Sequence, residues 1–238
     1  MNKGILYLIP VPLGESADPQ LVLTTSVLEI TRSLRFFIAE NSKSCRAFLK
    51  AAQNTIPLQE IHVESYGKHE RKEMSTKHFL KPLLDGHNVG LVSEAGCPAV
   101  ADPGSEIVRA AHENGIRVVP FVGPSSLLLA LMASGFNGQQ FRFHGYIPID
   151  KVEQMEWIQL MENDANRHEI TQIFIETPFR NMPMFEALMK SLHPNTMLCI
   201  ASALTLPEEK IVSKKISEWR KSPLPELHKV PAVFLIGK

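Results

Sequence analysis

A turn that combines reactive and conformationally unusual residues follows the apolar run at residues 89–92. Residues 92–104 read VSEAGCPAVADPG, which brings a hydroxyl, two carboxylates, a thiol and two glycines into one short segment. Open α/β sheets bind ligands at the carboxyl ends of their strands, where backbone N–H and C=O groups of the loops are accessible. We therefore interpret residues 93–98 as a candidate ligand-binding loop. An ordinary connecting turn is the alternative that these residues alone leave open.

Several catalytic motifs are missing from the sequence. It has no GxxxxGK(S/T) phosphate loop, no GxGxxG after a predicted strand and no GxSxG nucleophile elbow. The segment AHENG at residues 111–115 lacks the second histidine of a zinc-binding HExxH motif, and the nine histidines show no ligand spacing. We therefore predict no metal site.

Other predicted strands also end in segments of small or turn-forming residues. Each segment alone is typical of an ordinary strand-to-helix connection. Together they predict a site at the carboxyl ends of the strands. The segments are IPVPLGES (residues 9–16), AENSK (39–43), GPSS (123–126), ETPFR (176–180) and ASALT (201–205).

The first half of the sequence alternates predicted strands and helices, which is typical of a parallel sheet. Asp18 precedes Pro19 in the pattern of an N-cap followed by proline at the first helical position, and Asp102 precedes Pro103 in the same way. A charged helix is predicted over residues 68–86. The predicted strands cover residues 5–9, 35–39, 59–63, 89–93 and 116–123.

Gly123 and Pro124 separate the two halves, because glycine followed by proline interrupts both helical and strand periodicity. We expect an N-terminal α/β domain at residues 1–122 and a C-terminal α/β domain at residues 123–238, so the predicted fold class is α/β. The second domain has predicted strands at residues 141–146, 170–176, 195–201 and 231–237, with helices at residues 152–162 and 184–192.

Bulk composition restricts the possible partners. The 238 residues contain 25 Lys and Arg against 25 Asp and Glu, so RNA or an anionic membrane would be attracted only by a local basic patch. Three distant cysteines without CxxC spacing fit a reducing cytosol. The apolar run at residues 5–9 ends at Pro10 and is too short for a signal sequence or a membrane span. We expect a cytoplasmic protein with no membrane partner.

Six segments spread over nearly the whole chain form an ordered set of motifs. They are LYLIPVPLG, AEN, LVSEAGCPAVADPG, GIRVVPFVGPSS, ETPFR and ASALT. In these segments the sequence resembles the tetrapyrrole methylase superfamily, the class III S-adenosylmethionine-dependent methyltransferases. Within it, the sequence is most similar to the bacterial ribosomal RNA small-subunit methyltransferase I branch, which methylates a cytidine ribose 2′-hydroxyl. The family pattern SDAGTPxxxDPG matches residues 93–104, except that Glu94 and Cys97 stand for its Asp and Thr.

The resemblance implies two α/β domains of the tetrapyrrole methylase type, with S-adenosyl-L-methionine in the cleft between them, and a homodimer. Residues 93–98 would surround the methionine and ribose parts of the cofactor, with Gly96 allowing close approach of the backbone. The adenine would rest on backbone of the second domain. The cofactor-binding residues implied in this way are Pro10, Ser93, Glu94, Ala95, Gly96, Cys97, Pro98, Ser125, Ser126, Glu176, Ala201 and Ala232.

Methylation of a ribose hydroxyl requires an aligned methyl donor and a group that accepts the proton. The resemblance makes Glu40 the candidate for the catalytic base, although a solvated carboxylate at a helix start explains the residue equally well. Lys43 and Arg180 are candidate substrate-binding residues, because either side chain can contact an RNA phosphate.

Three segments depart from the branch, and each departure removes or weakens charge. AENSK at residues 39–43 replaces AEDTR, so Asn41 and Lys43 stand for an acid and an arginine, and bidentate recognition of phosphate is weakened. ASALT at residues 201–205 replaces ARELT, and Pro231 replaces the acid of a GE pair. The sequence ends at Lys238, directly after the last predicted strand, so we expect it to lack the small C-terminal domain of many members.

Three functional hypotheses remain open from the sequence. The first is a methyltransferase acting on RNA, such as ribosomal RNA of the small subunit. The second is a methyltransferase for a small molecule such as a tetrapyrrole, which would need no basic surface. The third is a cofactor-binding protein without catalysis, which the lost charges permit. A basic rim around the site would favour RNA, whereas a deep and neutral apolar cavity would favour a small molecule.

Overall fold

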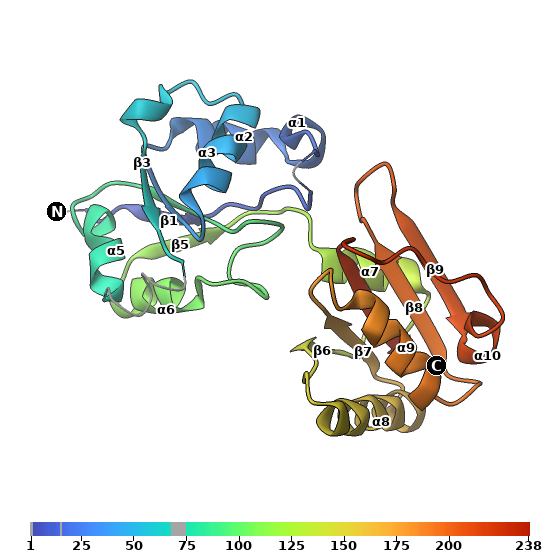
Figure 1. Ribbon diagram of the computed structural model, residues 1–238. Coiled ribbons are helices and arrows are strands. Elements are labelled where there is room, and N and C mark those ends of the chain that lie inside the picture. The colour runs from blue at the N-terminus through green and yellow to red at the C-terminus, as the bar shows by residue number, and fades with distance from the viewer. Residues whose placement is uncertain (1, 15, 68–74) are drawn as a thin grey trace. The chain divides into compact units, whose positions relative to one another are not determined.

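The computed structural model describes residues 2–14, 16–67 and 75–238. Contacts within the chain divide it into two compact units, Met1–Ser125 and Ser126–Lys238. Each unit contains one five-stranded sheet with helices packed on it (Figure 1). The α/β fold class predicted from the alternating sequence pattern is confirmed.

The first unit is built on a fully parallel sheet. Its strands lie in the order β3 (His62–Ser65), β2 (Phe36–Ala39), β4 (Val89–Val92), β1 (Ile5–Leu8) and β5 (Arg117–Pro120). All four residues of the central strand β4 are buried, as expected for a parallel strand covered on both faces. The predicted parallel sheet is confirmed, and the carboxyl ends of its strands share one edge.

Two hydrophobic clusters cover the opposite faces of this sheet. Phe37 of β2 packs in one cluster with residues of α2 (Thr25–Ser33) and α3 (Ser42–Ala51). Ile38 packs in the other cluster with residues of α5 (Thr76–Leu84) and α6 (Ser105–Glu113). Because neighbouring residues of a strand point to opposite faces, the two pairs of helices lie on opposite sides of the sheet.

The helix predicted at Pro19 is confirmed at its start but is shorter than a regular helix. The Asp18 side chain accepts a hydrogen bond from the Gln20 N–H at 2.9 Å, as an N-cap should. The helix nevertheless ends after one turn, as α1 (Pro19–Val22). Leu23 follows in an extended conformation before α2 begins.

Other boundaries in the first unit differ from the predictions. The cap assigned to Asp102 is wrong, because α6 begins at Ser105 and Gly104 occupies the N-cap position with a φ of 132°. The strand predicted at residues 59–63 is displaced, because a short 3-10 helix, η1 (Leu58–Glu60), precedes β3. Residues 68–74 of the predicted charged helix lie outside the described residues.

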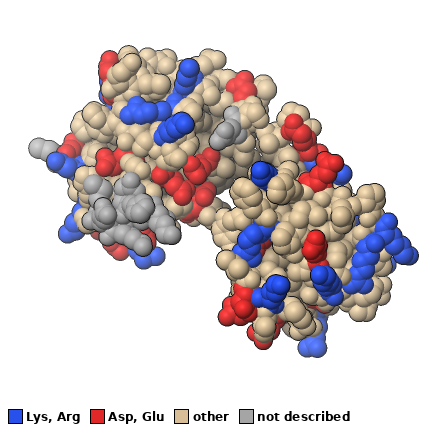
Figure 2. All heavy atoms as spheres, in the orientation of Figure 1, with Lys and Arg blue, Asp and Glu red and all other residues tan. Residues whose placement is uncertain are grey.

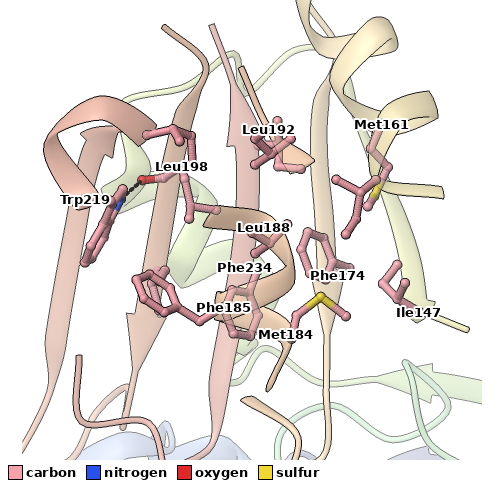
Figure 3. Close-up of a cluster of buried hydrophobic side chains, with 14 of the residues drawn as sticks. Ile147, Met161, Phe174, Met184, Phe185, Leu188, Leu192, Leu198, Trp219 and Phe234 are labelled. Atoms are coloured by element: carbon pink, nitrogen blue, oxygen red, sulfur yellow. Dashed lines mark hydrogen bonds between the residues drawn. The ribbon is translucent and has the colours of Figure 1, made fainter. Parts of the chain in front are cut away.

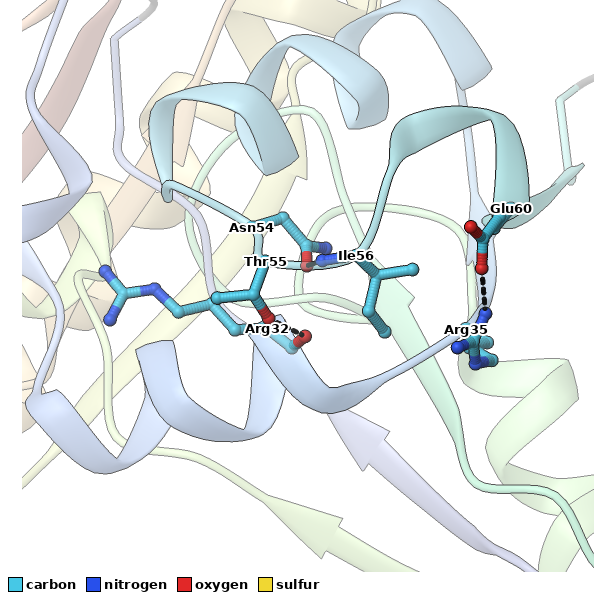
Figure 4. Close-up of polar contacts among 6 residues, drawn as sticks. All are labelled: Arg32, Arg35, Asn54, Thr55, Ile56 and Glu60. Carbon is cyan, nitrogen blue, oxygen red and sulfur yellow. Dashed lines mark hydrogen bonds and ion pairs between the residues drawn. The ribbon is translucent and has the colours of Figure 1, made fainter.

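Polar contacts fix the chain around η1 (Figure 4). Arg35 forms an ion pair with Glu60 at 2.7 Å, and the Thr55 hydroxyl donates to the Arg32 carbonyl at 3.5 Å. Both members of the ion pair are more than half exposed, so it contributes at most about 1 kcal/mol. These contacts join the segment before β3 to the end of α2 without carrying the stability of the unit.

The second unit is built on a mixed sheet. Its strands lie in the order β6 (Phe141–Tyr146), β7 (Thr171–Ile175), β10 (Ala232–Gly237), β8 (Met197–Ser202) and β9 (Lys210–Lys215). β6 and β7 are parallel, whereas β10 runs antiparallel to β7 and β8, and β9 runs antiparallel to β8. The carboxyl ends of β7 and β8 therefore lie beside the start of β10.

A dense aromatic core covers one face of this mixed sheet (Figure 3). Phe174 and Phe234 stack with their ring centroids 5.3 Å apart, and both are fully buried. Phe185 packs edge-on against Trp219, whose indole N–H donates to the Leu198 carbonyl at 2.9 Å. The core receives side chains from α8 (Lys151–His168), α9 (Asn181–Ser191) and α10 (Ile216–Trp219).

Sequence periodicity did not predict every element of the second unit. β9 and α10 were not expected, because lysines alternate unevenly with apolar residues along residues 210–215 and α10 has one turn only. The helix α7 (Ser126–Ser134) follows the predicted break at Gly123 and Pro124 and contacts β8, β9 and β10.

Within the described ranges, no helix has the length and apolar character needed to cross a bilayer.

Candidate functional site

The loop at residues 93–104 is tied to the segment after β1 by backbone pairing. The Val11 N–H donates to the Gly96 carbonyl at 2.9 Å, and the Gly96 N–H donates to the Val11 carbonyl at 3.1 Å. The buried Ser93 hydroxyl donates to the Ala95 carbonyl at 3.1 Å. The loop is therefore held by its own polar groups at the carboxyl end of β4.

Gly96 lies where three segments of the first unit pack closely together. It has a φ of +70°, and an added Cβ would lie 3.2 Å from a Leu13 methyl and 3.3 Å from the Pro124 carbonyl oxygen. Both of its backbone polar groups are occupied by Val11. Glycine thus permits close packing of three chain segments at this position.

The backbone of the same loop is strained at further positions. Ala99 and Ala101 have φ values of 65° and 61°, and Gly104 has a φ of 132°. A left-handed conformation costs a residue with a Cβ roughly 1–2 kcal/mol, and such strain is concentrated at functional sites. Two alanines in this conformation within three residues support a functional role for the loop.

Several sequence-predicted residues come together around this loop in the first unit. The Cys97 thiol donates to the Pro124 carbonyl at 3.4 Å, next to Ser125. Pro10 lies against Gly123 so closely that an added Cβ on the glycine would be 2.2 Å from the proline ring. The structure thus gathers Pro10, residues 93–98 and the segment that ends at Ser125.

The predicted catalytic loop is joined to the same site. The Ser44 hydroxyl, at the start of α3, donates to a Glu94 carboxylate oxygen at 3.0 Å. Glu40 directly follows β2 and precedes the Asn41 N-cap of α3, and Lys43 is the second residue of that helix. Glu40 and Glu94 therefore lie on neighbouring loops of the parallel sheet, where the sequence placed the site.

A third carboxyl group, Asp102, lies within electrostatic reach of these two. Burial, followed in importance by the negative charges of Glu40 and Glu94, raises the pKa of Asp102 from 3.8 to about 6. Figure 2 shows acidic side chains grouped together on the first unit. Among the described residues, no group of His, Cys, Asp or Glu side chains is arranged to hold a metal ion. These three carboxyl groups therefore form an acidic cluster in which Asp102 keeps its proton to a higher pH than an isolated aspartate does.

Asn41, one of the departures from the family pattern, has a clear structural role. Its side chain accepts hydrogen bonds from the backbone N–H groups of Lys43 and Ser44, at 2.9 and 3.4 Å, and so caps α3. Asparagine and aspartate are nearly equivalent as N-caps. The change from Asp to Asn at this position preserves the local fold while it removes one negative charge beside Glu40.

In the second unit, Glu176 is a buried carboxylate at the carboxyl end of β7. One of its oxygens forms an ion pair with the Arg180 guanidinium at 3.0 Å. Neither oxygen accepts a hydrogen bond of good geometry from another described residue. Burial raises the pKa of Glu176, and the Arg180 charge and the nearby Thr177 N–H oppose that rise.

Ala201 and Ala232 lie beside this carboxylate at the same end of the sheet. Ala232 pairs with Ser202, Val233 pairs with Ala201 and with Ile175, and Glu176 follows Ile175 directly. The structure therefore brings Glu176, Arg180, Ala201 and Ala232 together. Ser126 begins α7 elsewhere in the unit.

The loop after β8 shares the backbone strain of the loop after β4. Ala203 and Thr205 have φ values of 49° and 67°, and the Ala203 N–H donates to the Pro231 carbonyl at 3.0 Å. This segment lacks the charged residues of the family pattern. Its path is instead set by the backbone hydrogen bond to Pro231.

Two residues of the site were missed by the sequence analysis. Asn181 is fully buried, donates to the Val230 carbonyl at 2.6 Å and has a side-chain oxygen with no hydrogen-bond partner among the described residues. Asp102 was assigned to a helix cap instead of the acidic group. The sequence does show an amide directly after ETPFR, Asn181, and a second acid within residues 93–104, Asp102. It does not show which residues contact them.

Comparison with known proteins identifies the family. Residues 6–219 match Tetrapyrrole (Corrin/Porphyrin) Methylases, and the chain belongs to this family of methyltransferases. It is 31% identical over 217 residues to ribosomal RNA small subunit methyltransferase I of Bacillus subtilis (strain 168), covering 91% of this chain and 69% of the relative. It is 28% identical over 218 residues to the protein of the same name in Escherichia coli O157:H7, covering 91% of this chain and 71% of the relative.

Solved structures agree with this assignment at the level of the fold. The methyltransferase CobJ has a TM-score of 0.62 at 18% identity, covering 99% of this chain and 94% of its own. Uroporphyrin-III-C-methyltransferase from Thermus thermophilus has a TM-score of 0.56 at 18% identity, covering 99% of this chain and 92% of its own. The tetrapyrrole methylase fold implied by the sequence motifs is confirmed.

The Asn41 cap predicts the effect of two substitutions on the free energy of unfolding. Asn41→Ala removes both accepted hydrogen bonds and should lower it by ~1 kcal/mol. Asn41→Asp keeps the cap and should change it by less than about 0.5 kcal/mol, because the gain at the helix N-terminus is offset by repulsion from Glu40. Urea denaturation of the two variants tests this, and equal losses for both would contradict the capping role.

The raised pKa of Asp102 predicts an unusual pH dependence. Between pH 3.8 and about 6 the folded protein binds this proton more tightly than the unfolded chain, so the free energy of unfolding should fall as pH rises through that range. Asp102→Asn should flatten this dependence and stabilise the protein above pH 6 by ~1 kcal/mol, a value reduced for the solvent exposure of the group.

Urea unfolding of wild type and Asp102→Asn at several pH values measures this effect. Asp85→Asn is the control, because Asp85 is exposed at the end of α5. The same pH dependence of unfolding free energy in wild type and Asp102→Asn between pH 4 and 6 would contradict the assignment.

Proposed function

We propose that the protein is an S-adenosylmethionine-dependent methyltransferase that acts on ribosomal RNA of the small subunit, at a ribose 2′-hydroxyl. The family membership supports methyl transfer, and the names of the relatives support the RNA substrate over a tetrapyrrole. The observation that carries the proposal is the strained loop at residues 93–104, which matches the family pattern and lies beside Glu40 through the Ser44 to Glu94 hydrogen bond.

The polar groups of each unit fit the chemistry of S-adenosyl-L-methionine. In the first unit, Glu94 can accept hydrogen bonds from a ribose hydroxyl or from the ammonium group. In the second unit, the buried Asn181 oxygen has no hydrogen-bond partner among the described residues, and the buried Glu176 carboxylate retains acceptor capacity beside its ion pair with Arg180. Both groups are suited to a donor such as the adenine amino group. Further proposed contacts are Pro10, Ser93, Ala95, Gly96, Cys97, Pro98, Ser125, Ser126, Ala201 and Ala232.

The bound cofactor supplies an electrophilic methyl group, and the chain supplies orientation and proton transfer. Glu40 is proposed to accept the proton of the ribose hydroxyl, which contributes roughly 10²- to 10⁴-fold to the rate of such reactions. Lys43 and Arg180 are proposed to contact RNA phosphates.

Cofactor binding is expected with a dissociation constant near 1 μM, on the order of −8 kcal/mol. Gly96→Val should abolish it, because a β-branched side chain resists positive φ and would press on Leu13 and Pro124. Gly138→Val is the matched control, since nothing lies within 4 Å of an added Cβ there. Calorimetry provides the test, and wild-type protein that gives no binding heat at saturating cofactor would contradict the proposal.

Glu40→Gln should separate catalysis from binding. The cofactor dissociation constant should change less than about twofold, whereas turnover on small-subunit RNA should fall ~10²- to 10⁴-fold. Glu29→Gln is the control, because Glu29 is an exposed residue of α2. Equal turnover of wild type and Glu40→Gln would remove Glu40 from the catalytic role.

We further propose a homodimer, on the resemblance to the family alone. Light scattering should then give twice the chain mass of 26.6 kDa at micromolar concentration. The monomer mass at that concentration would refute the dimer without affecting the assignment of the site.

A further inference from the structure

Basic side chains are concentrated at one edge of the second unit's sheet. Residues 210–221, which form β9 and α10, contain five Lys and Arg and one Glu, whereas the whole chain balances 25 against 25. β9 pairs only with β8 and forms the edge of the sheet. Figure 2 shows basic side chains over the part of the unit that carries β9 and α10 in Figure 1.

A small cavity of about 160 Å³ lies on one face of this edge. Lys210, Val212 and Lys214 alternate along β9 onto that face, because every second residue of a strand points to the same side. Register places Lys210 opposite Ser202 and Val212 opposite Ile200. The remaining walls are Trp219 and residues 222–227, with the sequence SPLPEL.

The lining of the cavity combines apolar walls with ammonium groups. The Lys214 ammonium lies 5.3 Å from the Trp219 ring centroid and donates to the Ser222 hydroxyl at 3.0 Å. Lys210 and Leu224 are exposed at the rim, and Leu224 retains 71% of its accessible surface. Pockets for drug-sized ligands usually measure about 300 Å³ or more, so this cavity fits one planar ring and not a tetrapyrrole.

Three exposed lysines of this segment have free ammonium groups. Among the described residues, the side-chain ammonium groups of Lys210, Lys215 and Lys221 have no ion-pair or hydrogen-bond partner. Arg220 is different, because its guanidinium donates to the carbonyls of Met189 and Leu192. The free cations are therefore lysines on β9 and after α10, and of these three Lys210 lines the cavity.

We propose that this β9 surface, formed by residues 210–221 and the cavity, binds a single-stranded segment of RNA. One unpaired base occupies the cavity, and the phosphates on either side of it contact Lys210 and Lys214. Proteins that bind single strands combine a row of cations with sites that receive individual bases, and this surface has both. The inference deepens the proposed function and rests on RNA being the substrate.

Lysines on an edge strand also have a simpler explanation. They prevent the exposed strand from pairing with another chain, and this role requires no cavity and no bound anion. The two roles differ in measurable ways, because only RNA binding makes affinity depend on salt through these particular lysines.

The test compares two double variants that each remove two positive charges. Lys210→Gln with Lys214→Gln changes the rim of the cavity, and Lys151→Gln with Lys190→Gln changes exposed lysines of α8 and α9. Affinity for a labelled, unstructured RNA of ~12 nucleotides is measured by fluorescence anisotropy over a range of salt concentrations. Each lost phosphate contact should lower the slope of log K against log salt by about 0.7, so the first pair should lower it by about 1.4 and the control pair by less than 0.3.

A second variant tests the cavity itself. Leu224→Ala should weaken RNA binding severalfold without changing the salt slope, because it removes apolar contact with the base and no charge. Leu21→Ala is the control, since Leu21 is 86% exposed in the first unit. If loss of the Lys214 contact with Trp219 unfolds the first double variant, Lys210→Gln alone should still lower the slope by about 0.7.

Separate outcomes distinguish this inference from the proposed function. Equal slopes for the β9 and control variants, in protein that still methylates RNA, would overturn the β9 surface and leave the function intact. Wild-type protein that binds the oligonucleotide through β9 but transfers no methyl group to RNA would overturn the function and leave the surface intact. The expected result is loss of RNA affinity in the β9 variants with an unchanged dissociation constant for the cofactor.

Discussion

The pair of hydrogen bonds between Val11 and Gly96 is the interaction on which the first unit's site depends. Once β1 and β4 lie side by side in the parallel sheet, their continuing chains must separate or pair. Here they pair for one residue, which draws Leu13 and the Pro124 carbonyl around Gly96 and leaves no room for a side chain. The following residues then turn within a short distance, which forces Ala99 and Ala101 into left-handed conformations. The stability of the sheet supports this strain.

The second unit reaches a comparable arrangement with antiparallel strands. β10 lies between β7 and β8, so its first residues adjoin the carboxyl ends of both neighbours. The Ala203 N–H and the Asn181 amide then bond to carbonyls of Pro231 and Val230, which leaves Glu176 enclosed with Arg180 as its ionic partner. A carboxylate that is buried with acceptor capacity to spare is costly to the fold, and a binding function explains its presence.

Sequence reasoning succeeded where one local pattern determines the outcome. The buried run at β4 and the alternation of strands with helices predicted the parallel sheet, because a strand covered on both faces must be continuously apolar. It failed where the outcome depends on partners distant in sequence. Nothing in residues 99–104 shows that Asp102 faces Glu40, and nothing in residues 210–215 distinguishes an edge strand from a charged loop. Gly96 must lack a side chain because Leu13 and Pro124 pack against it, and only the folded chain brings these residues together.

The central claim is that methyl groups pass from S-adenosylmethionine to ribosomal RNA of the small subunit. The most direct measurement incubates the protein with methyl-labelled cofactor and small ribosomal subunits, then digests the RNA with alkali. A 2′-O-methylated ribose blocks alkaline cleavage of the adjoining phosphodiester, so the account predicts label in an alkali-resistant dinucleotide. A parallel incubation replaces the subunits with a cell extract. Label that stays out of the RNA and appears in the small-molecule fraction of that extract, with the protein folded and the cofactor bound, would contradict the proposed activity.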